Sequence, residues 1–181
     1  MNSGRYCGCR PNVSSYKVGG TVENKGADIL RKYLREIMLW LFVINLGTVF
    51  GAGLYEARVL IPCWQNTAPQ TWPNIGLKFW VYVTTVPLTL LTLANLIAAW
   101  QEGQGPRRQW WLGASAITVV ERSATFSYFI PTMIRLMESE EMPQEEVNAT
   151  LSQWLRLDYG RNVLTLVGWL AALKALSSPT S

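Results

Sequence analysis

The pair Glu121-Arg122 constrains this chain most, because it interrupts an apolar run long enough to cross a lipid bilayer. The run extends from Trp110 to Met133. At a helical rise of about 1.5 Å per residue, Glu121 lies roughly 17 Å from the Trp110 end, near the middle of a membrane. A charge at that depth costs about 2.5–3.5 kcal/mol on insertion scales, so it normally faces a bundle interior and finds a partner there. The pair therefore predicts a helical membrane protein with a polar interior.

The sequence contains four apolar segments that are long enough to span a membrane. They cover residues 37–61, 77–100, 110–134 and 155–176, and Pro87 inside the second predicts a kink. Polar residues recur at helical spacing along each segment, so we expect the four helices to converge on a polar centre. The fold class that follows is all-α: an integral membrane four-helix bundle with a polar interior.

Composition divides the chain into three parts. Residues 1–30 are rich in Gly, Ser and charge and lack a regular period, which predicts a disordered cytoplasmic arm. Residues 31–176 form the predicted four-span bundle, and residues 177–181 form a short tail. Basic residues gather before the first segment, and Arg107 and Arg108 lie between the second and third. The positive-inside rule then places both termini in the cytoplasm.

The chain has no histidine, and this absence excludes several functional classes. A Ser-His-Asp or Cys-His catalytic system cannot be built, and the commonest protein ligand of metals and haem is missing. The three cysteines are too few for a metal site of Cys alone. There is also no Gly-rich phosphate loop and no long basic stripe interleaved with aromatic residues. We therefore expect no metal and no nucleic-acid partner.

Matched depths in the bilayer predict which buried charges meet. Glu56 lies about 8 Å inside the outer end of the first segment, and Arg161 lies about 9 Å inside the outer end of the fourth. Arg58 and Asp158 are matched in the same way, both within about one turn of that interface. The depths therefore predict two ion pairs between the first and fourth segments, Glu56–Arg161 and Arg58–Asp158.

Glu121 and Arg122 point about 100° apart on a helix, so they are not expected to face one spot. One of the two side chains should then reach toward the first and fourth segments, and the other should find a neutral hydrogen-bonding partner. Tyr55, Tyr128 and Asn95 are the groups available for that role. The predicted result is a charged, tyrosine-lined cavity that opens toward the outer face.

Three stretches of the chain read GAGLYEARVLIPCW, YFIPTMIRL and WLRLDYGRNV. They resemble the anthrone oxygenase-like family of small four-span membrane proteins, a group formerly known as a domain of unknown function. The family pattern maps onto glycines and a proline in the first span, a Pro-Arg element ending the third and a Trp-Asp-Arg element opening the fourth. In this chain these are Gly47, Gly51, Gly53 and Pro62; Pro131 and Arg135; and Trp154, Asp158 and Arg161.

The resemblance implies oxidation of an anthrone-type carbon by molecular oxygen, without a metal or flavin cofactor. Relatives often carry a histidine where this chain has Tyr159. With no histidine present, the proton acceptor would have to be Glu56, Glu121 or Asp158. Arg161 or Arg122 would then stabilise the enolate.

The sequence leaves three functions open. It favours a non-catalytic protein that binds a lipophilic ligand or serves as a subunit of a membrane complex. The alternative is a cofactor-independent oxygenase acting on a phenolic or polyketide substrate, and the third is a small-solute transporter. Membrane lipids, a lipophilic or phenolic small molecule, and a complex partner or second copy are the expected partners.

Overall fold

A computed structural model describes residues 20–64, 78–138 and 142–179, and it describes side chains from residue 26 onward. Within these ranges the chain forms helices and no strand. The helical segments join end to end into four continuous rods, which cover residues 20–64, 78–100, 106–138 and 144–177. The prediction of an all-α chain with four helices is therefore confirmed for the described residues.

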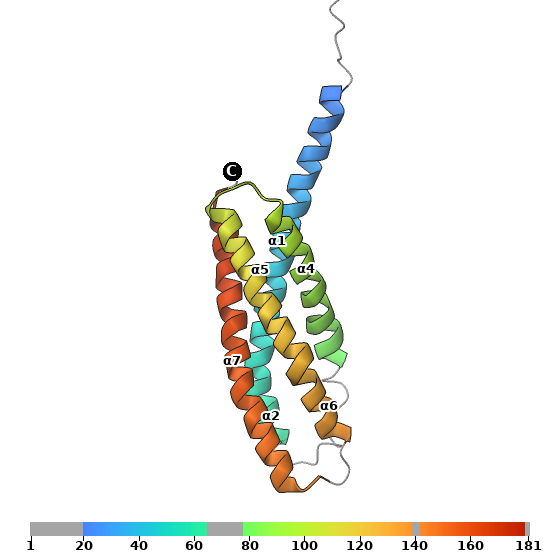
Figure 1. Cartoon of the computed structure of the whole chain (residues 1–181), viewed down its shortest axis with the longest axis vertical. Helices are drawn as coiled ribbons and strands as arrows, with labels where there is room; N and C mark the ends of the chain where they lie inside the picture. Colours follow the sequence, from blue (N-terminus) through green and yellow to red (C-terminus); the bar gives the residue numbers. More distant parts are fainter. Residues whose placement is uncertain (1–19, 65–77, 139–141, 180–181) are drawn as a thin grey trace, which may run out of the picture. The chain divides into compact units, whose positions relative to one another are not determined.

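Several rods change helical type along their length. Their segments in chain order are α1 (Gly20–Tyr55), η1 (Glu56–Leu60), α2 (Ile61–Trp64), η3 (Trp80–Thr85), α4 (Val86–Trp100), α5 (Pro106–Ala124), η4 (Thr125–Phe129), α6 (Ile130–Glu138) and α7 (Gln144–Ser177). The symbol η denotes π-helix, a wider helix in which an N–H bonds to the carbonyl five residues earlier. Figure 1 shows how the rods follow one another along the chain.

The chain divides into two compact units, residues 1–33 and residues 34–181. The described part of the first unit is helical, because α1 begins at Gly20 and not at the start of the predicted bundle near residue 31. Residues 1–19 of the predicted disordered arm lie outside the described residues. All the structure discussed below belongs to the second unit.

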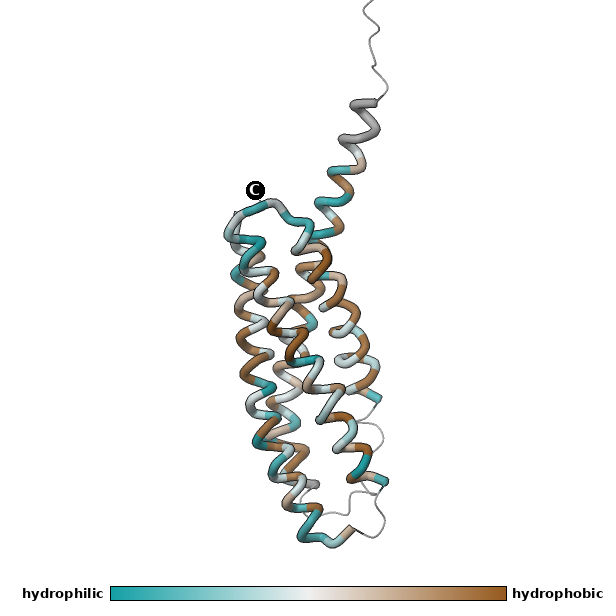
Figure 2. The backbone as a smooth tube through the Cα atoms, in the orientation of Figure 1, coloured by the Kyte–Doolittle hydropathy of each residue, from teal (hydrophilic) through white to brown (hydrophobic). Residues whose placement is uncertain are grey.

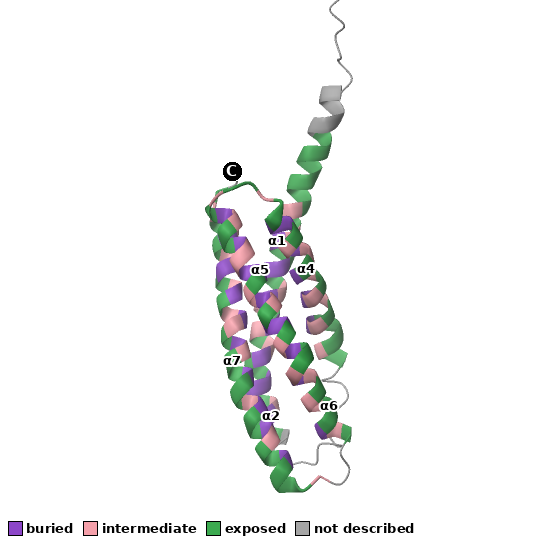
Figure 3. Ribbon diagram, viewed as in Figure 1, coloured by how far each residue is buried: buried purple, intermediate pink, exposed green. Residues whose placement is uncertain are grey.

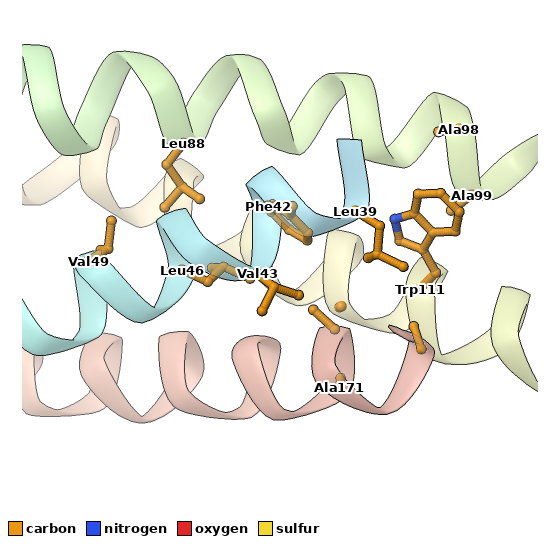
Figure 4. Packing of buried hydrophobic residues seen from close by; sticks show 13 residues of the cluster. Leu39, Phe42, Val43, Leu46, Val49, Leu88, Ala98, Ala99, Trp111 and Ala171 are labelled. Carbon is orange, nitrogen blue, oxygen red and sulfur yellow. The ribbon is translucent and has the colours of Figure 1, made fainter. Parts of the chain in front are cut away.

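One hydrophobic core lies between α1, α4, α5 and α7. Phe42 and Leu46 of α1, Leu88 of α4 and Trp111 of α5 are all buried in it, and small α7 residues such as Ala172 complete it. Figure 4 shows the α1 side chains lying between the ribbons of α4 and α7. The alanine side chains on this face of α7 are small, so the neighbouring helices can approach closely, and α5 packs extensively along α7.

A second hydrophobic core lies toward the other end of the bundle. It comprises Ile61, Phe129, Leu136, Val147, Leu151 and Trp154. Buried polar and charged residues lie in the stretches of chain between the two cores, among them Glu56, Glu121 and Asp158. Buried positions alternate with exposed ones along each helix (Figure 3). The predicted polar interior is therefore present.

Large apolar side chains also cover the outside of the rods. Ile44, Leu90, Val120 and Val163, one from each rod, are all about 60% exposed. Figure 2 shows hydrophobic residues along all four rods. Among the described helices, two are long and apolar enough to cross a membrane, Gly26–Cys63 and Trp80–Trp100.

Candidate functional site

Three π-helical turns are followed by the same short sequence pattern. η1, η3 and η4 each end directly before a β-branched residue that is followed by a proline. The three pairs are Ile61-Pro62, Val86-Pro87 and Ile130-Pro131. A proline inside a helix lacks an N–H, and its ring clashes with the carbonyl four residues earlier. The residue before each proline instead donates its N–H five residues back. The prolines thus account for the widened turns.

The three π turns border one cavity of about 290 Å³, which we call the π-turn cavity. Its wall is largely apolar, and its two charged residues are Glu56 and Arg161. The lining residues are Glu56, Trp80, Val81, Thr85, Thr125, Phe129, Ile130, Met133, Ile134, Met137, Trp154 and Arg161. The volume is at the lower end of the range of about 300–1,000 Å³ for small-molecule sites, and π turns often mark functional sites.

The charged end of the cavity is built by η1 and α7. The Arg161 Nη2 lies 3.9 Å from Glu56 Oε2 and 2.5 Å from Asp158 Oδ1. Asn162 donates a hydrogen bond of 2.9 Å to the other oxygen of Asp158. The predicted Glu56–Arg161 pair is therefore confirmed, and a second carboxylate shares the same guanidinium.

Arg161 also lies against the aromatic wall of the cavity. Its guanidinium carbon is 4.7 Å from the centre of the Phe129 ring, within the range of a cation–π interaction. The Trp154 ring meets Phe129 edge to face at 5.4 Å, and its Nε1 donates to the Phe129 carbonyl oxygen at 3.3 Å. These contacts fix the position of the Arg161 guanidinium relative to the rings of Phe129 and Trp154.

Glu121 and Arg122 bind each other, and the expectation that they would have separate partners was wrong. The Nε and Nη2 of Arg122 donate to the two oxygens of Glu121, each at 2.6 Å. The long arginine side chain is flexible enough to bring its guanidinium to the neighbouring carboxylate, so a 100° offset at the backbone does not keep the charged ends apart. Thr125, a residue of the cavity wall, donates to Glu121 Oε1 at 3.1 Å. Glu121 therefore touches the cavity through Thr125.

The other predicted site residues lie elsewhere. Arg58 is exposed, and Asp158 pairs with Arg161 and Asn162 in its place, so the predicted Arg58–Asp158 pair is corrected. Tyr55 is exposed. Tyr128 is half-buried and packs edge to face on Phe129, 5.3 Å between ring centres. Neither tyrosine is part of the cavity lining.

Asn95 is fully buried, is bonded to Trp111 of the first hydrophobic core and lies outside the cavity lining. Its amide nitrogen donates to the carbonyl oxygens of Met38 and Leu91, and its oxygen accepts from Trp111 Nε1 at 3.0 Å. Every polar atom of the side chain is thus used in joining α1, α4 and α5. This is the structural role that polar residues often have between packed helices.

The aromatic wall was not identified from the sequence as part of a site. Trp80 and Phe129 resemble ordinary interface or core aromatics when only their spacing is known. The signal that could have located them is the repeated hydrophobic–proline pair, because each proline places a widened turn just before it. Trp154 is singled out by the family pattern, which assigns it no place in a cavity wall.

Chemically, the site combines an apolar aromatic slot with one proton-exchanging group and one fixed cation. A carboxylate beside a guanidinium in a space with little water can exchange a proton with a ligand and stabilise negative charge on its oxygen. No group of three or more metal-ligating residues with suitable geometry occurs among the described residues.

One of the three comparisons with known proteins gives a match. No curated protein and no solved structure gives a match. The family model described as anthrone oxygenase matches residues 77–171, more than half of the chain. The matched region carries Arg161, Asp158 and the aromatic wall, whereas Glu56 lies before it. The chain therefore belongs to the anthrone oxygenase family.

Proposed function

We propose that this chain is an integral membrane protein that binds a lipophilic aromatic molecule in the π-turn cavity. The observation that carries the proposal is the cavity itself, an aromatic slot that ends at Glu56 and Arg161. Such a pairing of apolar walls with a few polar groups is typical of small-molecule sites. The alternative of a purely structural charge pair does not account for the open space beside it.

The chemistry of the walls narrows the ligand. Trp80, Phe129 and Trp154 favour a flat ring system, because aromatic rings attract one another in edge-to-face and offset arrangements. At the charged end of the cavity, a phenol or ketone oxygen of the ligand would contact the Arg161 guanidinium and the Glu56 carboxyl group. The ligand class is therefore a polycyclic phenol or ring ketone of low water solubility.

The membrane part of the proposal rests on the apolar exterior. All four rods expose large apolar side chains, so all four are proposed to span the bilayer, with both termini in the cytoplasm. In a variant lacking cysteines, Asn148→Cys should react with an impermeant thiol reagent added outside, and Gln104→Cys should react only after permeabilisation. The reverse pattern would contradict the orientation, and equal labelling would contradict the number of spans.

Ligand binding can be tested with anthrone and the purified protein in lipid nanodiscs. Trp80 and Trp154 line the cavity, so a bound aromatic ketone should quench part of the tryptophan fluorescence. Replacing Trp154 with Phe should reduce the quenching, whereas the matched change Trp110→Phe on the exposed surface should not. Saturable quenching that is unaffected by Trp154→Phe would mean that the ligand binds elsewhere.

A second candidate function is oxygenation of the bound ligand, and family membership favours it specifically. An ionised Glu56 would take a proton from a ring CH₂ next to the ketone system, and Arg161 would stabilise the resulting enolate. The carbanion would form a C–O bond with O₂, and the peroxide would receive the proton from Glu56. Loss of the second C–H proton and cleavage of the O–O bond would then give a ketone and water.

This reaction balances as CH₂ + O₂ → C=O + H₂O, so O₂ is the only oxidant that it needs. Oxygen uptake with anthrone under saturating binding conditions distinguishes the two functions. Glu56→Gln should retain binding and lose uptake, while the distant Glu102→Gln should retain both. Binding without any uptake by the unaltered protein would leave the non-catalytic function standing and reject the oxygenase.

A further inference from the structure

Five charged side chains are buried beside the charged end of the cavity in two bonded groups, Glu121 with Arg122, and Glu56 and Asp158 with Arg161. Together we call them the five-charge cluster. Its members are Glu56, Glu121, Arg122, Asp158 and Arg161. None of these side chains is more than 12% exposed. The cluster contains three carboxyl groups but only two guanidiniums, so it has a surplus of negative charge if every member is ionised.

The neighbouring helices bring no further charge to this group among the described residues. The wall contributed by η3 consists of Trp80, Val81 and Thr85, and η4 contributes Thr125 and Phe129. The titratable residues nearest to the cluster in the sequence are all exposed: Tyr55, Arg58, Arg156 and Tyr159. The phenol of Tyr128 on η4 packs on Phe129 outside the cavity lining. A buried charge without a partner is strongly unfavourable, so the surplus has to be neutralised inside the cluster.

The hydrogen bonds show which carboxyl group is least able to hold its charge. Glu121 receives two bonds from Arg122 and one from Thr125. Asp158 lies 2.5 Å from Arg161 and accepts a bond from Asn162. Among the described residues, Glu56 has only the 3.9 Å approach of Arg161, although it too is buried.

We propose that the cluster retains one proton, that Glu56 carries it in the ligand-free protein, and that the cavity therefore accepts neutral ring ketones and phenols but rejects permanent anions. A neutral ligand leaves the charge balance intact and can accept a hydrogen bond from the Glu56 carboxyl group. Oxygenation would in addition require Glu56 to release this proton before its carboxylate could act as the base. A permanent anion would add a second negative charge beside Asp158. The ligand selectivity in this inference rests on the proposed function, whereas the protonation of Glu56 does not.

Infrared spectroscopy of the ligand-free protein in nanodiscs at neutral pH tests the proton directly. The unaltered protein should show the carbonyl stretch of a protonated carboxylic acid, and Glu56→Gln should lose it. Asp158→Asn should also lose it, because two carboxylates then balance two guanidiniums and Glu56 ionises. Glu102→Gln, outside the cluster, should keep it.

Absence of the band from the unaltered protein would overturn the inference without requiring any variant to fold. Persistence of the band in a folded Asp158→Asn protein would also overturn it, because burial alone would then protonate Glu56. Folding of each variant is checked by circular dichroism and by elution as a single species.

The ligand part is tested with three compounds that share one ring system: anthrone, an anthrone sulfonamide and the corresponding anthrone sulfonate. The sulfonamide matches the sulfonate in size but is neutral. We expect the sulfonate to bind at least about tenfold more weakly than the sulfonamide, a difference of about 1.4 kcal/mol. Equal binding of the two would contradict the inference. Failure of all three to bind would reject the proposed function and leave the infrared result to decide the proton.

Discussion

The bundle contains two groups of paired charges, and they differ in balance. Near the α4–α5 connection, Arg35 and Arg107 face Glu36 and Glu102. Arg107 binds Glu36, and Glu102 lies 3.5 Å from Arg35 and 3.7 Å from Arg107. This group contains equal numbers of positive and negative side chains, and the side chains of Arg35 and Glu36 are about one-third exposed.

The five-charge cluster is deeper, has a surplus carboxyl group and borders an open cavity. A balanced group at a helix end can join α1, α5 and the connection between α4 and α5 without any further requirement. An unbalanced group in the interior is costly, and neutral side chains would hold helices together at a smaller cost. From this difference we propose a structural role for the first group and a chemical role for the second.

Loss of Arg161 should have the largest effect on stability. Arg161→Met leaves the fully buried Asp158 with Asn162 as its remaining partner, which should cost about 3–5 kcal/mol of unfolding free energy. Arg107→Met should cost less, about 1.5–3 kcal/mol, because Glu36 is partly exposed and Glu102 retains Arg35. Chemical denaturation in detergent measures both values.

The comparison is sharpened by the double variant Arg161→Met/Asp158→Asn. It removes the unpaired charge, so it should be more stable than Arg161→Met alone. Equal losses for Arg161→Met and Arg107→Met, or additive losses in the double variant, would remove the energetic distinction between the two groups.

Adding a methyl group at Gly53 should have a smaller effect. A Cβ there would overlap the amide of Asn162 and displace it from Asp158, so Gly53→Ala should cost about 1–3 kcal/mol. Gly51, on the same helix, has nothing within 4 Å of such a Cβ, which makes Gly51→Ala the matched control. Thermal unfolding measures the midpoint of each variant. Equal midpoints for Gly53→Ala and Gly51→Ala would contradict the close packing around Asp158.

Restoring a regular helix at Pro131 should change binding more than stability. Pro131→Ala allows an N–H to bond four residues back, which would tighten η4 and turn Thr125 and Phe129 away from the cavity. Affinity for anthrone should fall about tenfold, or about 1.4 kcal/mol, while the fold is kept. Pro106→Ala, at the first turn of α5, is the control and should bind normally. Unchanged affinity in Pro131→Ala would mean that the π turn does not shape the site.

Much of the architecture could be predicted because it depends on periodicity. The apolar segments gave the four helices, and matched depth along two of them gave the Glu56–Arg161 pair. Depth depends only on the rise per residue, which is nearly constant in helices. The chain position of a helical residue therefore predicts its level in the bundle well.

Side-chain choices between nearby partners could not be predicted in the same way. Arg122 reaches its own neighbour Glu121, and Asp158 takes Arg161 over Arg58, because long side chains cover several ångströms from any backbone position. Asn95 is predicted as a hydrogen-bonding partner for Glu121 or Arg122, yet its amide is used by Met38, Leu91 and Trp111. Such outcomes depend on the rotation of each helix about its axis, which the sequence pattern specifies only loosely.

Filling the π-turn cavity tests the central claim most directly. Met133 lines the cavity, so Met133→Trp should occupy it, and Val163→Trp places the same bulk on the exposed surface of α7. Isothermal titration with anthrone in nanodiscs should show normal binding for Val163→Trp and no binding for a folded Met133→Trp protein. Undiminished binding by Met133→Trp would contradict the claim that this cavity is the ligand site.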